Sequence, residues 1–439
     1  MSTLPPVRLG LLGLGTVGGG TLTVLRRNAA LIAARAGRRI EVVCATARDL
    51  NKARKLDLAG IDLLPDPQAV VDDPRIDVLV ELIGGIHPAR ELVLRALENG
   101  KHVVTANKAL IALHGNEIFE VARARGLMVA FEAAVAGGIP VIKVMREALA
   151  GNDIQWLAGI INGTCNFILS AMSDAGRDFN EVLAEAQRLG YAEADPSFDI
   201  DGIDAAHKLT ILASLAFGIP LQFERVHVEG IRHVSRTDVR YAERLGYHIK
   251  HLGIARQQDK GIELRVHPTL VPERAALANV NGVMNAVMVR GDAAGPVVLQ
   301  GAGAGALPTA SSVVADLVDV VRALTTDSEN RVPHLAFQPD TMDNLPTLGI
   351  EEVETAYYLR LSAADEPGVL ADVTRILADR GISIEQILQL DGDECSTEVP
   401  VVILTHRVPE RAMNEALTRI QALSTIRAPI NRLRVETLA

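Results

Sequence analysis

A short apolar run, a glycine-rich turn and a helical pattern follow one another at the start of the chain. They are Val7–Leu12, Gly13-Leu14-Gly15-Thr16-Val17-Gly18 and Thr21–Ala34. The first two glycines of such a turn let the backbone approach a pyrophosphate closely, and the third lets the helix pack on the strand. The helix N-terminus then faces the phosphates. This order predicts a dinucleotide-binding unit, with a purely structural turn as the alternative.

Strands and helices continue to alternate after this unit. Strands are expected at Ile40–Ala45, Val78–Ile83, His102–Thr105 and Met128–Phe131, with a helix at Pro88–Asn99. Strands separated by helices predict a parallel, doubly wound, Rossmann-like α/β sheet. Ligands of such sheets bind beyond the carboxyl ends of the strands, where Gly84-Gly85 and Asn107-Lys108 lie. Lys108 is therefore a candidate site residue, with an exposed loop cation as the alternative.

The coenzyme prediction depends on the residues that follow the second strand. An NAD-specific domain usually has an acidic side chain there for the ribose hydroxyls. This chain has Arg48, which can pair with a 2′-phosphate, with Arg54 or Lys55 as helpers. NADP is therefore expected. NAD stays possible, because a solvated basic loop would have the same composition and Asp49 is adjacent.

An acidic stretch from Gly190 to Lys208 leads from a proline-containing loop into a helical pattern. Its five carboxylates are Glu193, Asp195, Asp199, Asp201 and Asp204. With Asp201 or a neighbour as cap, the helix is expected to bury a stripe of Ile203, Ala206, Leu209, Thr210 and Ala213. Asp204 and Lys208 fall four apart, a spacing at which a carboxylate and an ammonium meet. Such a pair can hold a lysine beside a substrate carbonyl; the alternative is an acid-rich helix start favoured by the macrodipole.

Two loops that contain glycines are further candidates. Glu132–Pro140 has adjacent glycines and a proline before a helix to Ala150, and convergent carbonyls in such a bend can bind a hard cation. Gly301–Thr309 begins a helix that runs to about Ala323. It is expected to touch a phosphate or close over the cofactor, or else to serve as an interdomain hinge.

The second half of the chain predicts two more folded parts. Short β-like runs from Phe223 to Leu299 indicate a sheet-containing domain, and residues 326–352 are rich in turn formers and indicate a linker. The remaining runs have the order βαββαβ, which is the ferredoxin-like arrangement. Its strands are Tyr357–Ser362, Ile382–Leu390, Val399–Thr405 and Leu433–Glu436, and its helices are Val369–Arg380 and Glu410–Leu423.

The expected domains follow from these patterns. They are a dinucleotide-binding domain (1–137, with a returning helix at about 303–325), an α+β catalytic and dimerisation domain (138–302), the linker (326–352) and a C-terminal domain (353–439).

Charge and composition exclude several kinds of partner. A net charge of −10 and 3% aromatic residues argue against a nucleic acid, because phosphates need cations and bases need rings to stack on. No apolar stretch reaches the length of a membrane span. Cys44, Cys165 and Cys395 are odd in number and widely spaced, which suits a reducing cytoplasm and neither a disulfide framework nor a zinc site.

Taken together, these motifs resemble homoserine dehydrogenase of the monofunctional bacterial type with a C-terminal ACT domain. The resemblance covers essentially the whole chain. Its most specific parts are Gly13–Gly18, Thr105–Lys108, Glu132–Pro140, Asn162-Gly163-Thr164, Gly190–Lys208, Gly303-Ala304-Gly305 and Pro308-Thr309. It implies the reversible NAD(P)-linked interconversion of L-aspartate 4-semialdehyde and L-homoserine, on the route to threonine and methionine.

The resemblance also implies roles for individual residues. Lys208 would donate the proton to the aldehyde oxygen, and Lys108 would act at the substrate and the nicotinamide. Glu193 would hold the substrate amino group, with Asp199 and Asp204 lining the same pocket. The glycine-rich turn, Arg48, Gly190, Gly303 and Gly305 would contact the cofactor, and Gly190 and Tyr191 the substrate.

Three further implications concern ions, effectors and assembly. A sodium or potassium ion in a structural role would be held by Glu132, Val135, Gly137 and Ile139, largely through backbone oxygens. The ACT-like loop with Asp365 and Gly368 resembles the turn at which such domains bind amino acids, so L-threonine is a plausible effector. A homodimer or homotetramer is expected.

Two rival functions stay open from the sequence. The first is another Rossmann semialdehyde oxidoreductase that forms an acyl-thioester on Cys165, which lies in an Asn-Gly turn that opens a helix. The second is a catalytically inert amino-acid sensor, in which only the ACT domain binds a ligand. The constellation of Lys108, Glu193, Asp204 and Lys208 argues against the sensor.

Overall fold

The computed structural model describes residues 4–53, 56–327, 331–389 and 398–438, and these fall into two compact units. The first consists of Met1–Leu157, Ala206–Glu224 and Met284–Leu345, and the second of Ala158–Ala205, Arg225–Val283 and Pro346–Ala439. The predicted helpers Arg54 and Lys55, as well as Cys395, lie outside the described residues.

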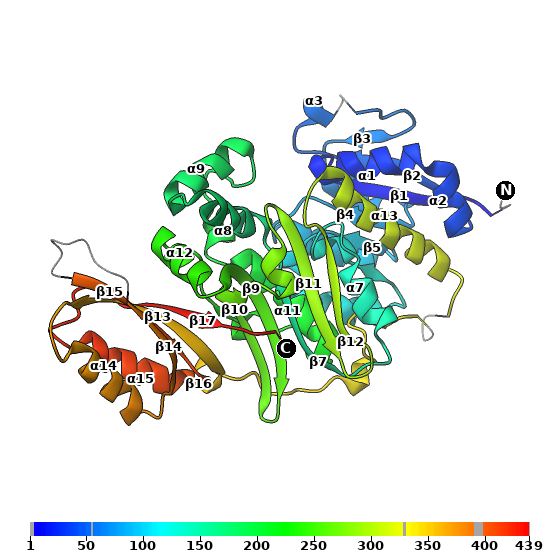
Figure 1. The fold of residues 1–439 in the computed structure, drawn as a ribbon. Helices are drawn as coiled ribbons and strands as arrows, with labels where there is room; N and C mark the ends of the chain where they lie inside the picture. The colour runs from blue at the N-terminus through cyan, green and yellow to red at the C-terminus, as the bar shows by residue number, and fades with distance from the viewer. Residues whose placement is uncertain (1–3, 54–55, 328–330, 390–397, 439) are drawn as a thin grey trace. The chain divides into compact units, whose positions relative to one another are not determined.

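A six-stranded parallel sheet is the centre of the first unit (Figure 1). Its strands are β1 (Val7–Leu12), β2 (Ile40–Thr46), β3 (Asp62–Leu64), β4 (Val78–Glu81), β5 (His102–Thr105) and β6 (Val129–Ala130), in the order β3-β2-β1-β4-β5-β6. The order reverses at β1 and β4, which makes the sheet doubly wound and confirms the Rossmann-like prediction. The carboxyl ends of β1 and β4 therefore mark the expected ligand edge.

Helices cover this sheet on both sides. They are α1 (Thr16–Arg27), α2 (Ala29–Ala36), α3 (Leu50–Ala53), α4 (Pro67–Asp72), α5 (Ala89–Glu98), α6 (Lys108–Ala124) and α13 (Ala306–Ala323). The prediction of one helix at Thr21–Ala34 was wrong in its bounds: helix begins directly after Gly15 and is interrupted at Asn28. A short α7 (Val141–Lys143) continues into a π-helix, Val144–Ala148, in place of the regular helix expected to Ala150.

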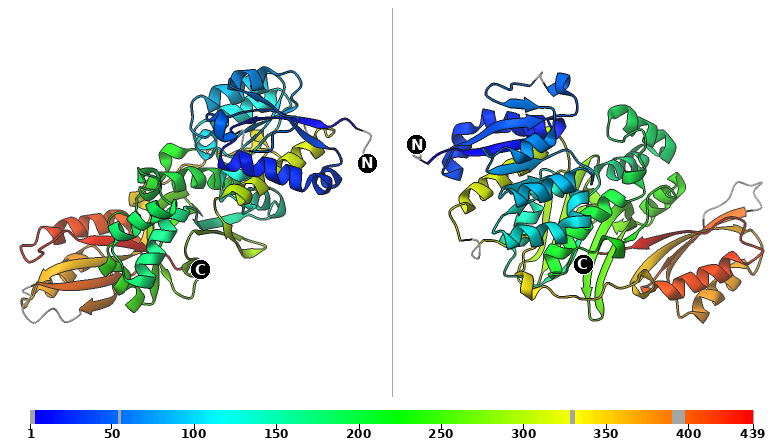
Figure 2. Two further views of the ribbon diagram at one scale, coloured as in Figure 1. Left: turned by 90° about the horizontal axis from the view of Figure 1, so that it is seen from above. Right: turned by 180° about the vertical axis from the view of Figure 1, so that it is seen from behind.

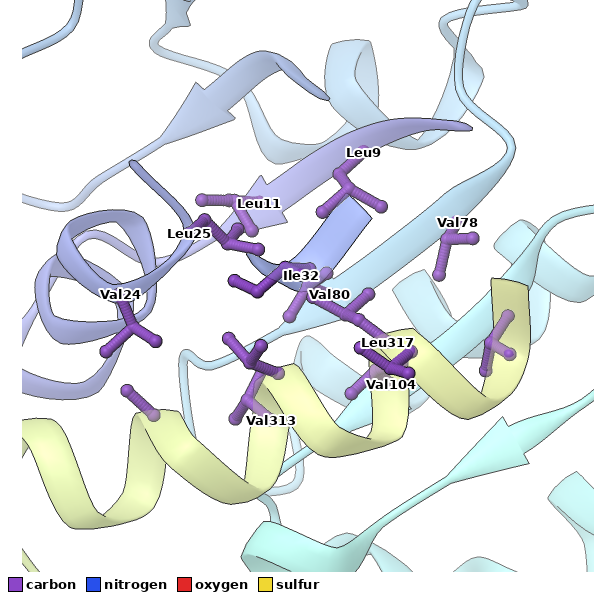
Figure 3. Close-up of a cluster of buried hydrophobic side chains, with 14 of the residues drawn as sticks. Leu9, Leu11, Val24, Leu25, Ile32, Val78, Val80, Val104, Val313 and Leu317 are labelled. Carbon is purple, nitrogen blue, oxygen red and sulfur yellow. The ribbon is translucent and has the colours of Figure 1, made fainter. Parts of the chain in front are cut away.

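The core of this Rossmann layer joins segments that are far apart in the sequence. Leu11 of β1, Leu25 of α1 and Leu317 of α13 pack together in one buried cluster (Figure 3). The helices α1 and α13 approach so closely that a Cβ on Gly20 would lie 2.4 Å from the carbonyl oxygen of Ala306. The returning helix is therefore an integral layer of the dinucleotide-binding fold.

The first unit also contains a hairpin of β11 (Met284–Gly291) and β12 (Gly295–Ala302). Two of the boundaries between the two units fall within β7 (Ile154–Ile160) and α11 (Ile203–Phe217).

The second unit begins with a helical layer beside a long hairpin. Its elements are α8 (Gly163–Ala175), α9 (Phe179–Leu189), α10 (Ser197–Ile200), β8 (His227–Val228), α12 (Arg236–Arg244), β9 (Tyr247–Gln258) and β10 (Gly261–Pro272). β9 and β10 have 12 residues each; β9 was not predicted, and β10 is longer than the short β-like run expected there. The difference arises because Lys250, His251, Arg265 and His267 are buried there in spite of their polarity.

The ACT part of the second unit has the predicted βαββαβ order. Its elements are β13 (Glu354–Ala364), α14 (Val369–Asp379), β14 (Ile384–Gln389), β15 (Glu398–Thr405), a short β16 (Val408–Pro409), α15 (Glu410–Gln421) and β17 (Asn431–Val435). The strands lie in the order β17-β13-β15-β14, and both helices cover one face of the sheet (Figure 2). The ferredoxin-like prediction is confirmed.

The ACT sheet is continuous with the hairpin of the second unit. β17 pairs in parallel with β10, with Thr269 opposite Arg434. The face of the ACT sheet away from α14 and α15 packs against α8 and α12, because Tyr358 and Leu433 share a buried cluster with Met172 of α8 and Tyr241 of α12. None of the helices in the described ranges is long and apolar enough to span a bilayer.

Candidate active site

The glycine-rich turn has the geometry that a pyrophosphate requires. Gly13 has a φ of 99°, and a Cβ on Gly18 would lie 1.9 Å from the carbonyl oxygen of Gly13. A Cβ on Gly15, by contrast, would meet nothing within 4 Å. Gly13 and Gly18 are therefore needed by the fold itself, whereas Gly15 leaves open space in front of Thr16 and Val17 at the start of α1.

A buried carboxylate organises the neighbouring strand ends. Glu81, at the end of β4, is fully buried and accepts hydrogen bonds from the amides of Ile83 (2.8 Å) and Gly84 (3.1 Å). Its second oxygen accepts the hydroxyl of Thr105 at the end of β5, at 2.6 Å. Glu81 thus fixes the loop after β4 to the loop after β5. Neither Glu81 nor Thr105 was among the predicted site residues.

Lys108 is held at the start of α6 by the same network. The amide of Asn107 donates to the Thr105 hydroxyl at 3.0 Å, and its side chain donates to the carbonyl of Gly85 at 2.6 Å. The side-chain oxygen of Asn107 caps α6 by accepting from Leu110 at 3.1 Å. Lys108 is the first residue of this helix and is half-buried at the ligand edge of the sheet. Arg48 follows β2 and is exposed.

Helix α11 carries Asp204 and Lys208 one turn apart, as the spacing predicts. Both are buried, with 2% and 8% of their surface exposed. The prediction of a single buried stripe was wrong, because residues 204–219 are buried on every side of the helix. A helix buried all round belongs to the interior of a large protein, so these two charges lie in an enclosed setting.

Asn162 joins two of the predicted carboxylates in the second unit. Its side-chain nitrogen donates to Asp199 and to Asp204, each at 2.8 Å. Its side-chain oxygen accepts from the amide of Cys165 at 2.8 Å and so caps α8. Thr164, on the first turn of α8, donates to the carbonyl of Tyr191 at 2.6 Å. Asn162 and Thr164, at the start of α8, therefore hold three residues of the acidic stretch in place: Tyr191, Asp199 and Asp204.

The loop after α9 presents the remaining predicted substrate residues. Gly190 ends α9 with a φ of 78°, and a Cβ there would meet nothing within 4 Å. Tyr191 is 44% exposed and packs edge-on against Phe167 at 5.0 Å. Glu193 has an exposed side chain, and Gln187 donates to its carbonyl at 3.1 Å. These side chains are open to a ligand.

Cys165 has the setting of a packing residue. It is fully buried in the core of the second unit, and its thiol lies 3.3 Å from the carbonyl oxygen of Asp199. A thiol that forms an acyl-thioester must reach its substrate, and complete burial opposes this.

The loop from Glu132 to Ile139 is almost completely buried. Both oxygens of Glu132 accept backbone amides, from Ile142 at 2.9 Å and Lys143 at 2.8 Å, and burial raises the pKa of Glu132 to about 7. Ala136 and Gly137 have φ values of 53° and 49°, which bend the backbone sharply between Val135 and Ile139.

Helix α13 and the glycine loop before it support this bend. Ser312 donates to the carbonyl of Gly137 at 2.7 Å, and a Cβ on Gly137 would lie 2.4 Å from the carbonyl oxygen of Gly303. Gly305 immediately precedes α13 with a φ of 121°. The glycine loop is thus packed against the candidate cation loop. Among the described residues, no group of three or more His, Cys, Asp or Glu side chains has the arrangement of a metal site.

The predicted effector residues and the cavity of the first unit lie apart from the charged cluster in sequence. Asp365 and Gly368 are exposed in the ACT domain, and Gly368 precedes α14 with a φ of 97°. A cavity of about 740 Å³ in the first unit is lined by Arg146, His334 and neighbouring residues, and by none of the predicted site residues. Cavity size therefore does not locate the predicted site, which is defined by its charged side chains.

Comparison with known proteins gives one consistent result. The chain matches family models for homoserine dehydrogenase at residues 140–318, for the homoserine dehydrogenase NAD-binding domain at 13–132, and for the ACT domain at 357–424. It is 62% identical to a homoserine dehydrogenase of Pseudomonas aeruginosa over 435 residues, covering 99% of this chain and 100% of that protein.

Solved structures agree. The crystal structure of a homoserine dehydrogenase from Thiobacillus denitrificans is 62% identical, covers 100% of both chains and has a TM-score of 0.96. A hyperthermophilic archaeal homoserine dehydrogenase in complex with NADPH has a TM-score of 0.62 at 28% identity, over 72% of this chain and 98% of that one.

Proposed function

This chain belongs to the homoserine dehydrogenase family and carries a C-terminal ACT domain, and we propose how its residues share the reaction of such an enzyme. It is an NAD(P)-dependent oxidoreductase. The proposed reaction is the reversible reduction of L-aspartate 4-semialdehyde to L-homoserine. The observation that carries the assignment of roles is the Asn162–Asp199–Asp204 cluster, with Lys208 one helical turn beyond Asp204.

Lys208 is the proposed proton donor. Reduction turns the aldehyde oxygen into an alkoxide, and a buried ammonium both stabilises that charge and protonates it. In the opposite direction a neutral Lys208 accepts the hydroxyl proton of homoserine. Lys108, held by the Glu81–Thr105–Asn107 network, is the proposed second lysine at the substrate and the nicotinamide. Asp204 is the proposed carboxylate partner of the reacting groups on α11.

The acidic stretch is the proposed amino-acid binding surface. Glu193 and Asp199 are suited to the ammonium group of the substrate, and Gly190 and Tyr191 line the same loop. Asn162 brings the carboxylates of Asp199 and Asp204 together by donating a hydrogen bond to each.

A nicotinamide cofactor supplies or accepts the hydride. The residues fit it, because a Cβ on Gly15 would meet open space in front of the N-terminus of α1. Thr16, Val17, Gly303 and Gly305 are the proposed neighbours of the cofactor. NADP is the proposed coenzyme, with Arg48 as the partner of the 2′-phosphate. Replacement of Arg48 by Ala should raise the KM for NADPH more than that for NADH; an equal change would remove this role.

A monovalent cation is the proposed occupant of the bend at Glu132, Val135, Gly137 and Ile139. These residues offer one carboxylate and backbone oxygens, the hard donors that sodium or potassium prefers. Replacement of sodium and potassium in the buffer by a bulky organic cation should lower the melting temperature of the native enzyme. An unchanged melting temperature would refute a structural ion.

The ACT domain is the proposed site of an amino-acid effector, with L-threonine bound near Asp365 and Gly368. A homodimer or homotetramer is the proposed assembly. Sedimentation would measure the assembly, and a monomer would exclude it. Calorimetry with L-threonine would test the effector, with Gly368→Val as the variant expected to lose binding.

Turnover and an acid variant test the central assignment together. NADPH oxidation with L-aspartate 4-semialdehyde is expected in the native protein and is expected to fall by about 100-fold to 10,000-fold in Lys208→Ala, with NADPH binding retained. Equal turnover in both proteins would remove the role of Lys208. Replacement of Cys165 by Ser should leave turnover intact, and its loss would favour the acyl-thioester mechanism.

A further inference from the structure

An arginine of the ACT domain reaches the catalytic part of the second unit. Arg434, on β17, is 1% exposed and donates to both carboxylate oxygens of Glu229, at 2.9 Å and 3.0 Å. It also pairs with Glu410 of α15. Burial opposes ionisation of Glu229, but hydrogen bonds from His227 and Arg434 hold its pKa well below the ordinary value. The ion pair between Glu229 and Arg434 is therefore formed in the folded protein at neutral pH.

Glu229 is anchored at the end of β8. Its amide donates to the carbonyl of Val266 on β10 at 2.7 Å, and its own carbonyl lies 3.0 Å from Nε2 of His251 on β9. Backbone and side chain of this one residue thus join the hairpin to the ACT strand.

The residues directly after Glu229 support the acidic stretch. The amide of Ile231 donates to the carbonyl of Ile200 at 2.9 Å. A Cβ on Gly230 would lie 2.3 Å from that carbonyl oxygen and 2.6 Å from Cα of Asp201, so the two backbones touch without space for any side chain. Arg232 donates to the Ser197 hydroxyl at 2.9 Å and pairs with Asp201.

The supported helix carries a proposed substrate residue. Asp199 lies on α10, between Ser197 and Ile200, and it accepts from the Asn162 amide that also holds Asp204. Contacts and neighbouring residues of the chain therefore link Arg434, through Glu229, Ile231 and Ile200, to Asp199. All of these residues belong to one compact unit.

We propose that Glu229 is a positioning residue, which lets the ACT strand β17 set the position of Asp199 in the substrate site. The proposal rests on the assignment of Asp199 to substrate binding. Because the backbone at Gly230 is in close contact with Ile200 and Asp201, a displacement of Arg434 that moves Glu229 also moves α10. An amino acid that binds the ACT domain acts on substrate affinity by this route.

The test is a kinetic comparison of the full-length native enzyme with Glu229→Gln. The variant keeps the size of the side chain and removes the negative charge that pairs with Arg434. The KM for L-homoserine should rise roughly threefold to thirtyfold, the range found for residues along coupled networks, while kcat and the affinity for NADPH stay within about twofold. Hydrogen exchange of residues 197–204 should become faster.

Glu436→Gln is the matched control. Glu436 is a buried carboxylate two residues beyond Arg434, and it pairs with Arg265 of β10 and Arg256 of β9. It should lose stability and leave the KM for homoserine unchanged. An equal rise in both variants would overturn the proposal, because general loosening of the joint would then explain it.

A second variant covers the case in which Glu229→Gln does not fold. Arg434→Lys keeps the buried charge but not the two-pronged contact, and the same rise in KM is expected. An unchanged KM in a folded variant refutes the coupling. Asp199→Asn is measured alongside: if it fails to raise the KM, the substrate assignment is wrong, and if it alone raises the KM, only the coupling is wrong.

Discussion

The side-chain amide of Asn162 donates a 2.8 Å hydrogen bond to the buried carboxylate of Asp204. The same nitrogen also serves Asp199, 37 residues away in the sequence. Asn162→Asp should lower kcat/KM for homoserine roughly 10-fold to 100-fold, because each hydrogen bond to a charged group contributes about 1.5–3 kcal/mol. Aspartate caps helices as well as asparagine does, but its carboxylate would face those of Asp199 and Asp204 in a buried position, so the melting temperature should also fall. Steady-state kinetics with thermal unfolding measure both; a normal kcat/KM would refute the role of the cluster.

Gly15 and Gly18 should respond differently to the same substitution. Gly15→Ala places a methyl group in open space and should leave the melting temperature intact while weakening NADPH binding. Gly18→Ala places it 1.9 Å from the Gly13 carbonyl and should destabilise the first unit by about 1–3 kcal/mol. Fluorescence titration with NADPH and thermal unfolding distinguish the two, and identical behaviour would contradict the geometry.

The rate of homoserine oxidation should rise with pH. A lysine that accepts the substrate proton must first be neutral, and lysine ordinarily loses its proton near about pH 10.4. A rate profile of the chemical step between neutral and alkaline pH measures this. A flat profile would exclude a lysine as the general base.

Stability should fall in acid because of His251. Burial lowers the pKa of His251 from its ordinary value to about 4. Between pH 6.5 and 4 the unfolded chain therefore binds a proton that the folded chain does not, so stability falls as the pH is lowered, by about 1.4 kcal/mol per pH unit for one such group. Denaturant titrations at several pH values give the free energy of unfolding of the native protein and of His251→Gln. Between pH 4 and 6.5 this free energy should depend less steeply on pH in the variant; an equal pH dependence would exclude His251 as a cause.

Removal of the ACT domain, residues 353–439, should give an insoluble protein. β10 would lose its pairing with β17, and the fully buried Asp238 would lose Arg360, while the buried Arg265 would lose Glu436 and keep Glu263. A buried charge without its partner costs about 3–5 kcal/mol. Expression with separation of soluble and pelleted fractions measures the outcome. A soluble, cooperative truncated protein would show that the joint is dispensable.

The sequence predicted local features well and long-range contacts poorly. The bounds of β1 and β5, the end of α13 and the βαββαβ order depend on residues close together, and periodicity and glycines reveal them. Asn162, Glu81 and Glu229 depend on partners 24 to 205 residues away, and no local pattern records such pairs. The Asn-Gly turn and the family resemblance were the signals for Asn162, and the strand-end position was the signal for Glu81.

Buried polar residues explain the other errors. β9 was missed because Lys250 and His251 interrupt its apolar pattern, yet Lys250 donates to the carbonyl of Val280 at 2.8 Å inside the fold. Helix α11 was expected to have one polar face, but Asp204, His207 and Lys208 are all buried. Where function requires charges in the interior, hydropathy alone misplaces the surface.

The joint between β10 and β17 has a consequence for the order of events during synthesis. Glu436 is translated 171 residues after its partner Arg265, and Arg434 is translated 205 residues after its partner Glu229. At about 5–20 residues per second, these two long-range ion pairs stay unformed for roughly 10 to 40 s of synthesis, although Glu263 and His227 are already present beside Arg265 and Glu229. The hairpin β9–β10 is thus exposed to aggregation for this time, and the second unit closes only when its last strand has been translated.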